Sequence, residues 1–240
     1  MKITQIKWMA SAVILLALAA CGPGNPWPDI PGGAIGDRSV VLIGDSLEVQ
    51  MGPELGHTLA WYGMNATVTN DAVGGTGLLD DNLQSRVDSD LDAAPPHSII
   101  VYEWYGNCFF LAAGCAYYGS PQFYSDWETS MRNLIADARS RGDTVVWVTL
   151  PPSGDPNGQS LQLNDIYARV CAQLGVQRAD WFTALSDTGG NYQEWLSYAD
   201  VFSDPAWHHV RDPDGIHLLP DGAERAATWT AQAIRAVWTS

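Results

Sequence analysis

Basic residues are scarce in this chain, which has 12 lysine and arginine residues against 27 aspartate and glutamate residues and a formal net charge of −15. So acidic a chain has little means of neutralising phosphate groups. Binding to nucleic acid, or to an anionic lipid surface through a basic patch, is therefore disfavoured. We interpret the acidity as a source of solubility outside the cell.

Cysteine is also scarce, with 4 residues in the chain. Neither a Cys-x-x-Cys spacing nor a cluster of histidine and cysteine is present, so the sequence suggests no zinc site. Cys108 and Cys115 are close together in a predicted loop, and in an oxidising compartment they could form a disulfide. Cys171 lies in a helical pattern, which favours a buried, small hydrophobic side chain.

No apolar run long enough to span a bilayer is present, since the run at residues 9–18 is too short. Lys2 and Lys7 precede this run, which is the layout of a secretory signal. The run ends in Leu-Ala-Ala followed by Cys21, the pattern cut by the bacterial lipoprotein signal peptidase. The sequence therefore predicts a lipid on Cys21, the alternative being a simple cleaved signal and an incidental cysteine. Two acyl chains would give stable anchoring.

These features divide the chain into three parts. Residues 1–20 are predicted to be a lipoprotein signal peptide. Residues 21–38 are rich in proline and glycine and are expected to be a tether. Residues 39–240 are expected to form one domain large enough to bury a substantial core.

Short apolar runs alternate with helical patterns along this domain. Strands are predicted at residues 39–43, 65–69, 98–102, 144–150 and 176–179. Helices are predicted at residues 47–62, where Pro53 could interrupt, and at 84–93, 121–142, 161–174 and 220–237. The alternation predicts a three-layer α/β/α domain with a mostly parallel five-stranded sheet. Functional sites in such sheets form at the carboxyl ends of the strands.

The segment Gly44-Asp45-Ser46-Leu47 follows the first predicted strand and opens the first predicted helix. At a helix N-terminus, Ser46 could offer both a nucleophilic oxygen and a backbone N–H donor for an oxyanion. A turn with a helix-capping serine is the simpler interpretation of this segment taken alone.

The segment Asp214-Gly215-Ile216-His217 supplies the partners that a serine nucleophile needs. A serine hydroxyl requires an adjacent base, and a carboxylate can fix the tautomer of a histidine in that role. A surface turn is the alternative, because Asp-Pro-Asp-Gly is a favourable turn sequence. The order of the two segments, at opposite ends of one α/β domain, favours catalysis.

Two further loops follow predicted strands. Residues 70–77 include Gly74, Gly75 and Gly77, and glycine allows a loop to turn a backbone N–H toward a reacting centre. Asn107 follows the third strand, where its amide could donate to a developing oxyanion. A tight loop and an ordinary turn residue are the respective alternatives.

Together these four segments, which lie in order between residues 39 and 217, resemble the SGNH hydrolase family, also called GDSL esterases and lipases. The resemblance implies a flavodoxin-like SGNH hydrolase fold. It also implies that Ser46 is the nucleophile, that His217 is the base and that Asp214 orients the base.

The resemblance further implies an oxyanion hole made by the backbone N–H groups of Ser46 and Gly75 and the side chain of Asn107, with Gly74 as the alternative to Gly75. One departure is that Cys108 stands where the family usually has aspartate after the asparagine. The loop after Asn107 is also aromatic, and could set specificity or pack beneath the site.

Other candidates rank lower. His208 and His209 are expected to be substrate contacts or surface residues, and Asp212 has a longer spacing to His217 than Asp214 has. His57 and His97 lie on or beside predicted elements, away from the ends of the strands. Glu103 is a potential structural partner in the site. The chain lacks the Gly-x-Ser-x-Gly elbow of α/β-hydrolases and a phosphate-cradling loop.

The predicted function is a serine esterase that hydrolyses a short acyl ester or an O-acylated glycan or lipid without metal or organic cofactor. The alternatives are an envelope O-acyltransferase that uses the same residues, and a non-catalytic glycan-binding lipoprotein. We expect an exported monomer that reaches the membrane through the lipid on Cys21, or is secreted without it, and that does not bind nucleic acid.

Overall fold

A computed structural model describes residues 35–107, 118–154, 160–199 and 205–238. Its centre is a five-stranded sheet in the order β2-β1-β3-β4-β5, in which all neighbouring strands are parallel. These strands are β1 (Ile35–Gly44), β2 (Met64–Asn70), β3 (Ile99–Glu103), β4 (Thr144–Val148) and β5 (Gln177–Ala179). This is the predicted sheet.

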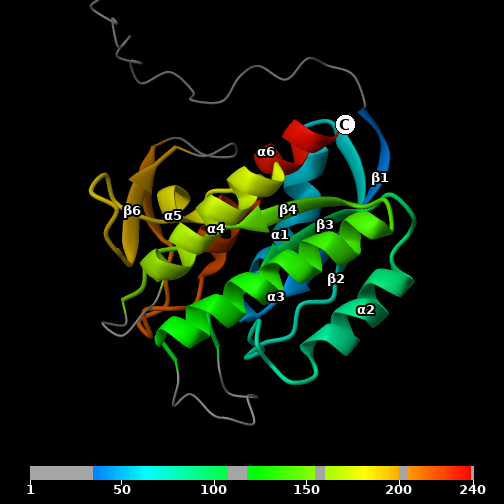
Figure 1. Ribbon diagram of the computed structural model, residues 1–240. Helices are drawn as coiled ribbons and strands as arrows, with labels where there is room; N and C mark the ends of the chain where they lie inside the picture. The colour runs from blue at the N-terminus through cyan, green and yellow to red at the C-terminus, as the bar shows by residue number, and fades with distance from the viewer. Residues whose placement is uncertain (1–34, 108–117, 155–159, 200–204, 239–240) are drawn as a thin grey trace, which may run out of the picture.

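Helices cover both faces of the sheet (Figure 1). They are α1 (Ser46–Trp61), α2 (Leu83–Ala93), α3 (Pro121–Ser140), α4 (Ser160–Leu174), α5 (Trp181–Ala184) and α6 (Pro220–Val237). Helices α1 and α6 pack on each other at one face, and α2, α3 and α4 lie along the other. The three-layer α/β/α prediction is confirmed.

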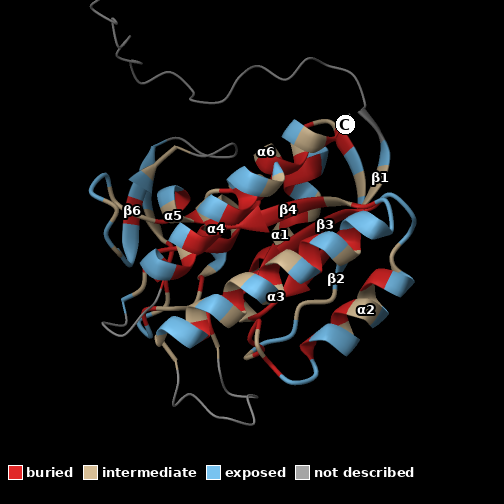
Figure 2. Ribbon diagram, in the orientation of Figure 1, coloured by how far each residue is buried: buried red, intermediate tan, exposed pale blue. Residues whose placement is uncertain are grey.

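The central strands carry continuous apolar runs, at residues 40–43 of β1, 99–102 of β3 and 145–148 of β4, because helices cover both faces of the sheet. All five residues of β3 are buried, and the inner faces of the helices are buried against the sheet (Figure 2). The register pairs Gly44 of β1 with Glu103 of β3, and Leu42 of β1 with Asn70 of β2. The loops that follow these three strands therefore begin at the same edge of the sheet.

Three details differ from the sequence-based expectations. Helix α1 continues through Pro53, because Met51, Leu55 and Leu59 are buried in the core and hold both halves of the helix in line. Strand β1 begins at Ile35, inside the segment predicted to be a tether, where it pairs with β2.

The third difference is that the region between β5 and α6, for which the sequence predicted no helix or strand, contains regular structure. It holds α5 and a two-stranded antiparallel hairpin, β6 (Trp195–Tyr198) and β7 (Ala206–His209). Each of these strands has only four residues, too few to show a clear alternation in the sequence.

The cysteines divide between described and undescribed segments. Cys171 is buried in α4, as predicted, and burial raises the pKa of its thiol to about 12. Cys21, Cys108 and Cys115 lie outside the described residues. Among the helices that are described, none is both long and apolar enough to cross a bilayer.

Candidate active site

Ser46, His217 and Asp214 form a continuous hydrogen-bonded chain at the carboxyl edge of the sheet. Ser46 Oγ lies 2.9 Å from His217 Nε2, and His217 Nδ1 lies 2.5 Å from Asp214 Oδ2. An ionised carboxylate only accepts, so Nδ1 carries the proton and Nε2 is left to accept from the serine hydroxyl. The three residues thus have the geometry of a nucleophile, its base and the group that orients the base.

Asp214 is held as a carboxylate by the loop that it belongs to. Its Oδ1 accepts from the backbone N–H groups of Ile216, at 2.8 Å, and His217, at 2.9 Å. Burial opposes ionisation, but the hydrogen bonds from His217 and Ile216 outweigh it and hold the pKa of Asp214 below its ordinary value. This carboxylate is therefore suited to stabilise a protonated imidazole.

Contacts outside the three residues fix the position of this loop. Asp212 accepts from the backbone N–H of Asp214 at 3.1 Å, and its own N–H donates to the carbonyl of His217 at 2.9 Å. The side chain of Gln50, one turn into α1 from Ser46, accepts from the backbone N–H of Leu218 at 2.9 Å. Asp212 is thus part of the turn, and Asp214 is the carboxylate that contacts the histidine.

Ser46 is the first residue of α1, directly after β1. Its backbone N–H belongs to the first helical turn and has no acceptor within the helix, so it faces the region where the helix dipole is positive. Asp45 is the helix cap, and its Oδ1 accepts from the N–H of Leu47 at 3.0 Å. The sequence between β1 and α1 thus positions both the Ser46 hydroxyl and a backbone N–H at the positive end of the helix.

Asn107 is linked to this cap. Its Nδ2 donates to Asp45 Oδ2 at 2.9 Å and to the carbonyl of Thr76 at 3.0 Å, and the N–H of Tyr105 donates to Asp45 Oδ2 at 2.8 Å. Asp45 therefore receives three hydrogen bonds, from α1 and from the loop after β3. It joins the segment that carries Ser46 to the segment that carries Asn107.

The glycine-rich loop after β2 lies between these two segments. A Cβ atom added to Gly74 would lie 3.7 Å from the Cβ of Ser46, so the backbone of Gly74 passes beside Ser46. Gly75 has a φ of +80°, in the left-handed region that favours glycine. Gly77 approaches Asn107 so closely that a Cβ there would lie 2.0 Å from the Asn107 carbonyl oxygen. The loop needs glycine to reach the site.

Two further carboxyl groups, those of Glu48 and Glu103, are fully buried near Asp45. Burial, and next the nearby Asp45 carboxylate, raise the pKa of both well above the ordinary value. Burial also raises the pKa of Asp45, partly offset by hydrogen bonds from Glu103, Tyr105 and Leu47. We assign the charge to Asp45, which receives three N–H donors, and a proton to Glu103, whose carboxyl group faces it.

The other histidines do not contact Ser46 in the described structure. His208 Nδ1 lies 3.2 Å from Asp221 Oδ2, and the His209 ring stacks on Trp195. His97 Nδ1 lies 3.2 Å from the carbonyl of Gly142. Within the described residues, no group of three or more histidine, cysteine, aspartate or glutamate side chains could hold a metal ion.

Sequence reasoning missed the residues that join the segments. The sequence presents Asp45 only as part of the Gly-Asp-Ser motif and Glu103 only as a minor candidate, and it does not mark Glu48 or Gln50. A polar residue directly after a buried strand was the available signal for Asp45. The contacts of Glu48 and Gln50 depend on the tertiary structure and gave no such signal. Of the aromatic loop after Asn107, residues 108–117 lie outside the described part.

A family model described as "Protein of unknown function (DUF459)" matches residues 39–233. The chain belongs to the DUF459 family. A search of curated proteins finds no match.

Solved structures show that this DUF459 protein has the SGNH/GDSL hydrolase fold. The solved structure of a protein assigned as an arylesterase, from Agrobacterium tumefaciens str. C58, is similar to this chain. The two sequences are 18% identical, and the structures match with a TM-score of 0.59 over 83% of this chain and 99% of that one. A protein assigned to the GDSL lipolytic family from Desulfitobacterium hafniense DCB-2 is 18% identical, with a TM-score of 0.57 over 81% and 98%. The acetyl xylan esterase AlAXEase is 14% identical, with a TM-score of 0.57 over 82% and 99%.

Proposed function

We propose that this DUF459 protein is a serine esterase in which Ser46, His217 and Asp214 form the catalytic triad. The observation that carries the proposal is the hydrogen-bonded chain from Ser46 Oγ through both nitrogens of His217 to Asp214. Ser46 and His217 are 171 positions apart in the sequence. If the Ser46 segment were only a helix cap and the Asp214–His217 segment only a surface turn, these two side chains would have no reason to be in contact.

In the proposed reaction, Ser46 Oγ attacks an ester carbonyl while His217 Nε2 takes the hydroxyl proton. The carbonyl carbon becomes tetrahedral and its oxygen gains the negative charge. Asp214 stabilises the protonated imidazole, which then gives its proton to the leaving alcohol. A water molecule, deprotonated by His217, attacks the acyl-enzyme and releases the acid and the free serine.

The oxyanion is proposed to form against the backbone N–H of Ser46, the backbone N–H of Gly75 and the amide of Asn107, with Gly74 as the alternative to Gly75. Both amide hydrogens of Asn107 already bond to Asp45 and the carbonyl of Thr76. The bond to Asp45 fixes the orientation of the amide. The hydrogen directed at Thr76 is the one that would be shared with the oxyanion.

Asn107→Ala is expected to lower turnover of a short acyl ester by roughly 10²–10³-fold, since removal of one preorganised oxyanion donor has an effect of this size. The measurement is steady-state hydrolysis of 4-nitrophenyl acetate by the purified variant. Labelling of Ser46 by a fluorophosphonate should persist, because the nucleophile and base are intact.

Asn82→Ala is the matched control, because Asn82 lies at the start of α2 and its side chain makes no capping hydrogen bond there. This variant should keep normal turnover. Near-normal turnover by Asn107→Ala would remove this residue from the oxyanion hole.

Covalent labelling tests the proposed function itself. A fluorophosphonate should label the wild-type protein on Ser46, whereas Ser46→Ala should be unlabelled. Absence of labelling in a folded wild-type protein would favour the non-catalytic glycan-binding alternative. Release of free acid, compared with formation of an acylated sugar, separates the esterase from an O-acyltransferase that uses the same residues.

Substrate class is proposed from the surroundings of Ser46. Val49, one turn along α1, and Val73, beside Gly74, are exposed apolar side chains near the nucleophile. Such side chains can contact a short acyl group. The shared fold with an acetyl xylan esterase is a reason to include acetylated glycans, beside simple aryl and alkyl esters, in the first substrate panel.

We further propose that the protein is exported and anchored through a lipid on Cys21. Cys21→Ala is expected to abolish incorporation of a radioactive fatty acid and to release the protein from the membrane fraction. The reason is that the cysteine thiol is the site of acylation, and two or more chains are needed for stable anchoring. Unchanged fatty-acid labelling of Cys21→Ala would contradict the proposal, and Cys171→Ala, with its thiol buried in α4, provides the control.

A further inference from the structure

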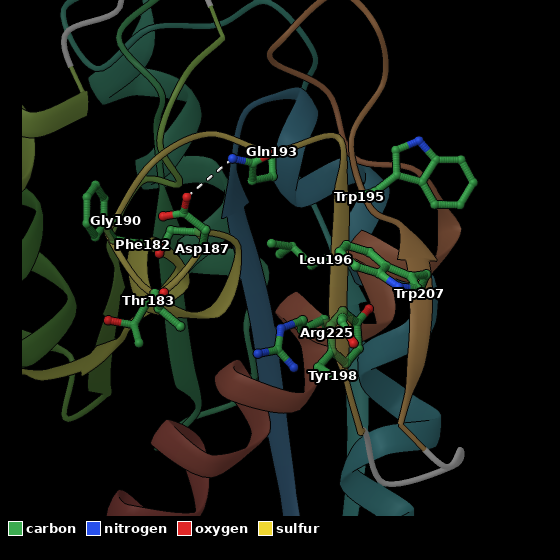
Figure 3. Close-up of a pocket in the computed structure, with 13 residues that line it drawn as sticks. Phe182, Thr183, Asp187, Gly190, Gln193, Trp195, Leu196, Tyr198, Trp207 and Arg225 are labelled. Atoms are coloured by element: carbon green, nitrogen blue, oxygen red, sulfur yellow. Dashed lines mark hydrogen bonds between the residues drawn. The ribbon is translucent and has the colours of Figure 1, made fainter.

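A cleft with a volume of about 680 Å³ lies between the β6–β7 hairpin and the segment formed by α5 and the loop after it. Figure 3 shows Phe182, Thr183 and Asp187 on one side of this cleft, and Trp195 and Trp207 on the hairpin side. None of the residues proposed above for catalysis lines the cleft. It is therefore a second candidate binding site.

Two exposed tryptophans dominate the hairpin side. Trp207 is 71% exposed and Trp195 is 48% exposed. The register pairs Trp195 with His209 and Ser197 with Trp207, so these four side chains share one face of the hairpin. The Trp195 ring stacks on His209, with ring centroids 4.2 Å apart and 3° between the planes. The Trp195 indole is thus held in place by His209, and Trp207 lies diagonally across the hairpin from it.

The rest of the lining is made largely of short neutral polar side chains. The Tyr198 hydroxyl donates to the carbonyl of Asp221 at 3.1 Å. The other hydroxyl and amide groups among the lining residues belong to Thr183, Ser186, Thr188, Gln193 and Ser197. Groups of this kind can both donate and accept hydrogen bonds. The cleft therefore offers neutral hydrogen-bonding groups, and the two indoles lie beside it on the exposed face of the hairpin.

The two charged residues of the lining are engaged with the protein. Asp187 accepts from the N–H groups of Gly189, at 2.8 Å, and Asn191, at 2.9 Å, and from the side-chain amide of Gln193. Arg225 lies over the Tyr198 ring, 3.8 Å from its centroid, and donates to the carbonyl of Ala184. Both charged groups thus already interact with other groups of the protein, so the lining does not favour a charged ligand.

We propose that this cleft binds a neutral oligosaccharide. A sugar ring has an apolar face of C–H groups, which matches the electron-rich face of an indole, and a rim of hydroxyls, which matches threonine, serine and glutamine side chains. Two indoles on one face can support consecutive sugar rings. An anionic lipid surface is disfavoured because the chain carries a net charge of −15.

The cleft is connected to the triad through the chain itself. Strand β7 ends at His209, and the loop with Asp214 and His217 follows. The Tyr192 hydroxyl, from the loop between Ser186 and Gln193, donates to the carbonyl of Asp212 at 3.3 Å. The inference that the bound glycan belongs to the ester substrate rests on the proposed function, whereas the binding of the glycan does not.

Binding is tested by calorimetry on the full-length chain carrying Ser46→Ala, so that no ester bond is consumed. The probes are the tetrasaccharides of xylose and of N-acetylglucosamine, with phosphatidylcholine vesicles in a parallel titration. Trp207→Ala and Trp195→Ala should each weaken binding of the preferred tetrasaccharide by about tenfold. Trp207→Tyr should retain most of the affinity, because it keeps an aromatic face.

Trp61→Ala is the matched control, because Trp61 is 51% exposed but lies at the end of α1, outside the cleft. It should bind like the parent. Absence of binding by both tetrasaccharides would overturn the proposal. So would an affinity equal to that of the parent in the two cleft tryptophan variants, or tryptophan-dependent binding to the vesicles in place of the sugars.

A kinetic comparison connects the cleft to catalysis. With Ser46 restored, Trp207→Ala should raise KM for an acetylated xylotetraose about tenfold while leaving KM for 4-nitrophenyl acetate unchanged, since the small ester does not reach the cleft. Equal effects on both esters would contradict a glycan subsite. Hydrolysis of 4-nitrophenyl acetate by Ser46→Ala would instead contradict the proposed triad. It would leave the calorimetric test of glycan binding valid.

Discussion

Ser46→Ala is expected to lose hydrolysis of a short acyl ester by roughly 10⁴–10⁶-fold, and His217→Ala by a similar factor. The reason lies in the 2.9 Å contact between Ser46 Oγ and His217 Nε2. A serine hydroxyl is a poor nucleophile at neutral pH unless a base removes its proton, and the base has no role without the nucleophile. Steady-state kinetics with 4-nitrophenyl acetate measures both losses.

The double variant Ser46→Ala/His217→Ala should lose little beyond either single change, because residues that act as one unit have strongly non-additive effects. Ser85→Ala on α2 and His57→Ala on α1 are the matched controls for residue type, and both should be fully active. Near-normal turnover by Ser46→Ala would show that the nucleophile is wrong. An active His217→Ala together with an inactive His208→Ala or His209→Ala would reassign the base.

The sheet could be predicted from the sequence because its strands are short, apolar and rich in β-branched residues. The runs at residues 39–43, 98–102 and 144–150 correspond to β1, β3 and β4, which are covered on both faces. The β6–β7 hairpin could not be predicted in the same way. Its two strands have Trp195 and Trp207 exposed, so the apolar residues do not mark a buried face.

The triad segments were recognisable for a related reason. Ser46 comes two residues after the end of β1, and His217 comes three residues before the start of α6. Loops in such positions form the functional sites at the carboxyl edge of a parallel sheet. The role of Asp45 could not be predicted because its partners, Leu47, Tyr105 and Asn107, come from two segments. Only the tertiary structure brings them to one carboxylate.

The buried glutamates should make the protein less stable as the pH rises. Glu48 and Glu103 are fully buried, and burial together with the Asp45 charge raises the pKa of each well above the ordinary value of 4.5. Neither oxygen of Glu48 receives a hydrogen bond from the described residues. Among the described residues, no cation neutralises these two carboxyl groups. The folded protein therefore keeps both of them protonated over a pH range in which the unfolded chain has released both protons.

The sign of the effect follows from proton counting. Above a pH of about 4.5 the folded state binds more protons than the unfolded state, so the free energy of unfolding falls with rising pH until the folded-state pKa is reached. Each group contributes a decrease of about 1.4 kcal/mol per pH unit within that range. Glutamine has nearly the same shape and cannot ionise, so Glu48→Gln should remove its share of the decrease.

The measurement is urea denaturation of the wild type, Glu48→Gln and Glu103→Gln between pH 4 and pH 8. Both variants should match or fall below the wild type at pH 4 and become progressively more stable than it toward pH 8. Glu103→Gln also retains an N–H donor toward Asp45, which replaces the proton of the carboxyl group. Glu194→Gln, at an exposed position next to β6, is the control and should run parallel to the wild type. If the two buried-site variants also run parallel to the wild type, these carboxyls are not held neutral in the folded protein, and the charge assigned to Asp45 alone is wrong.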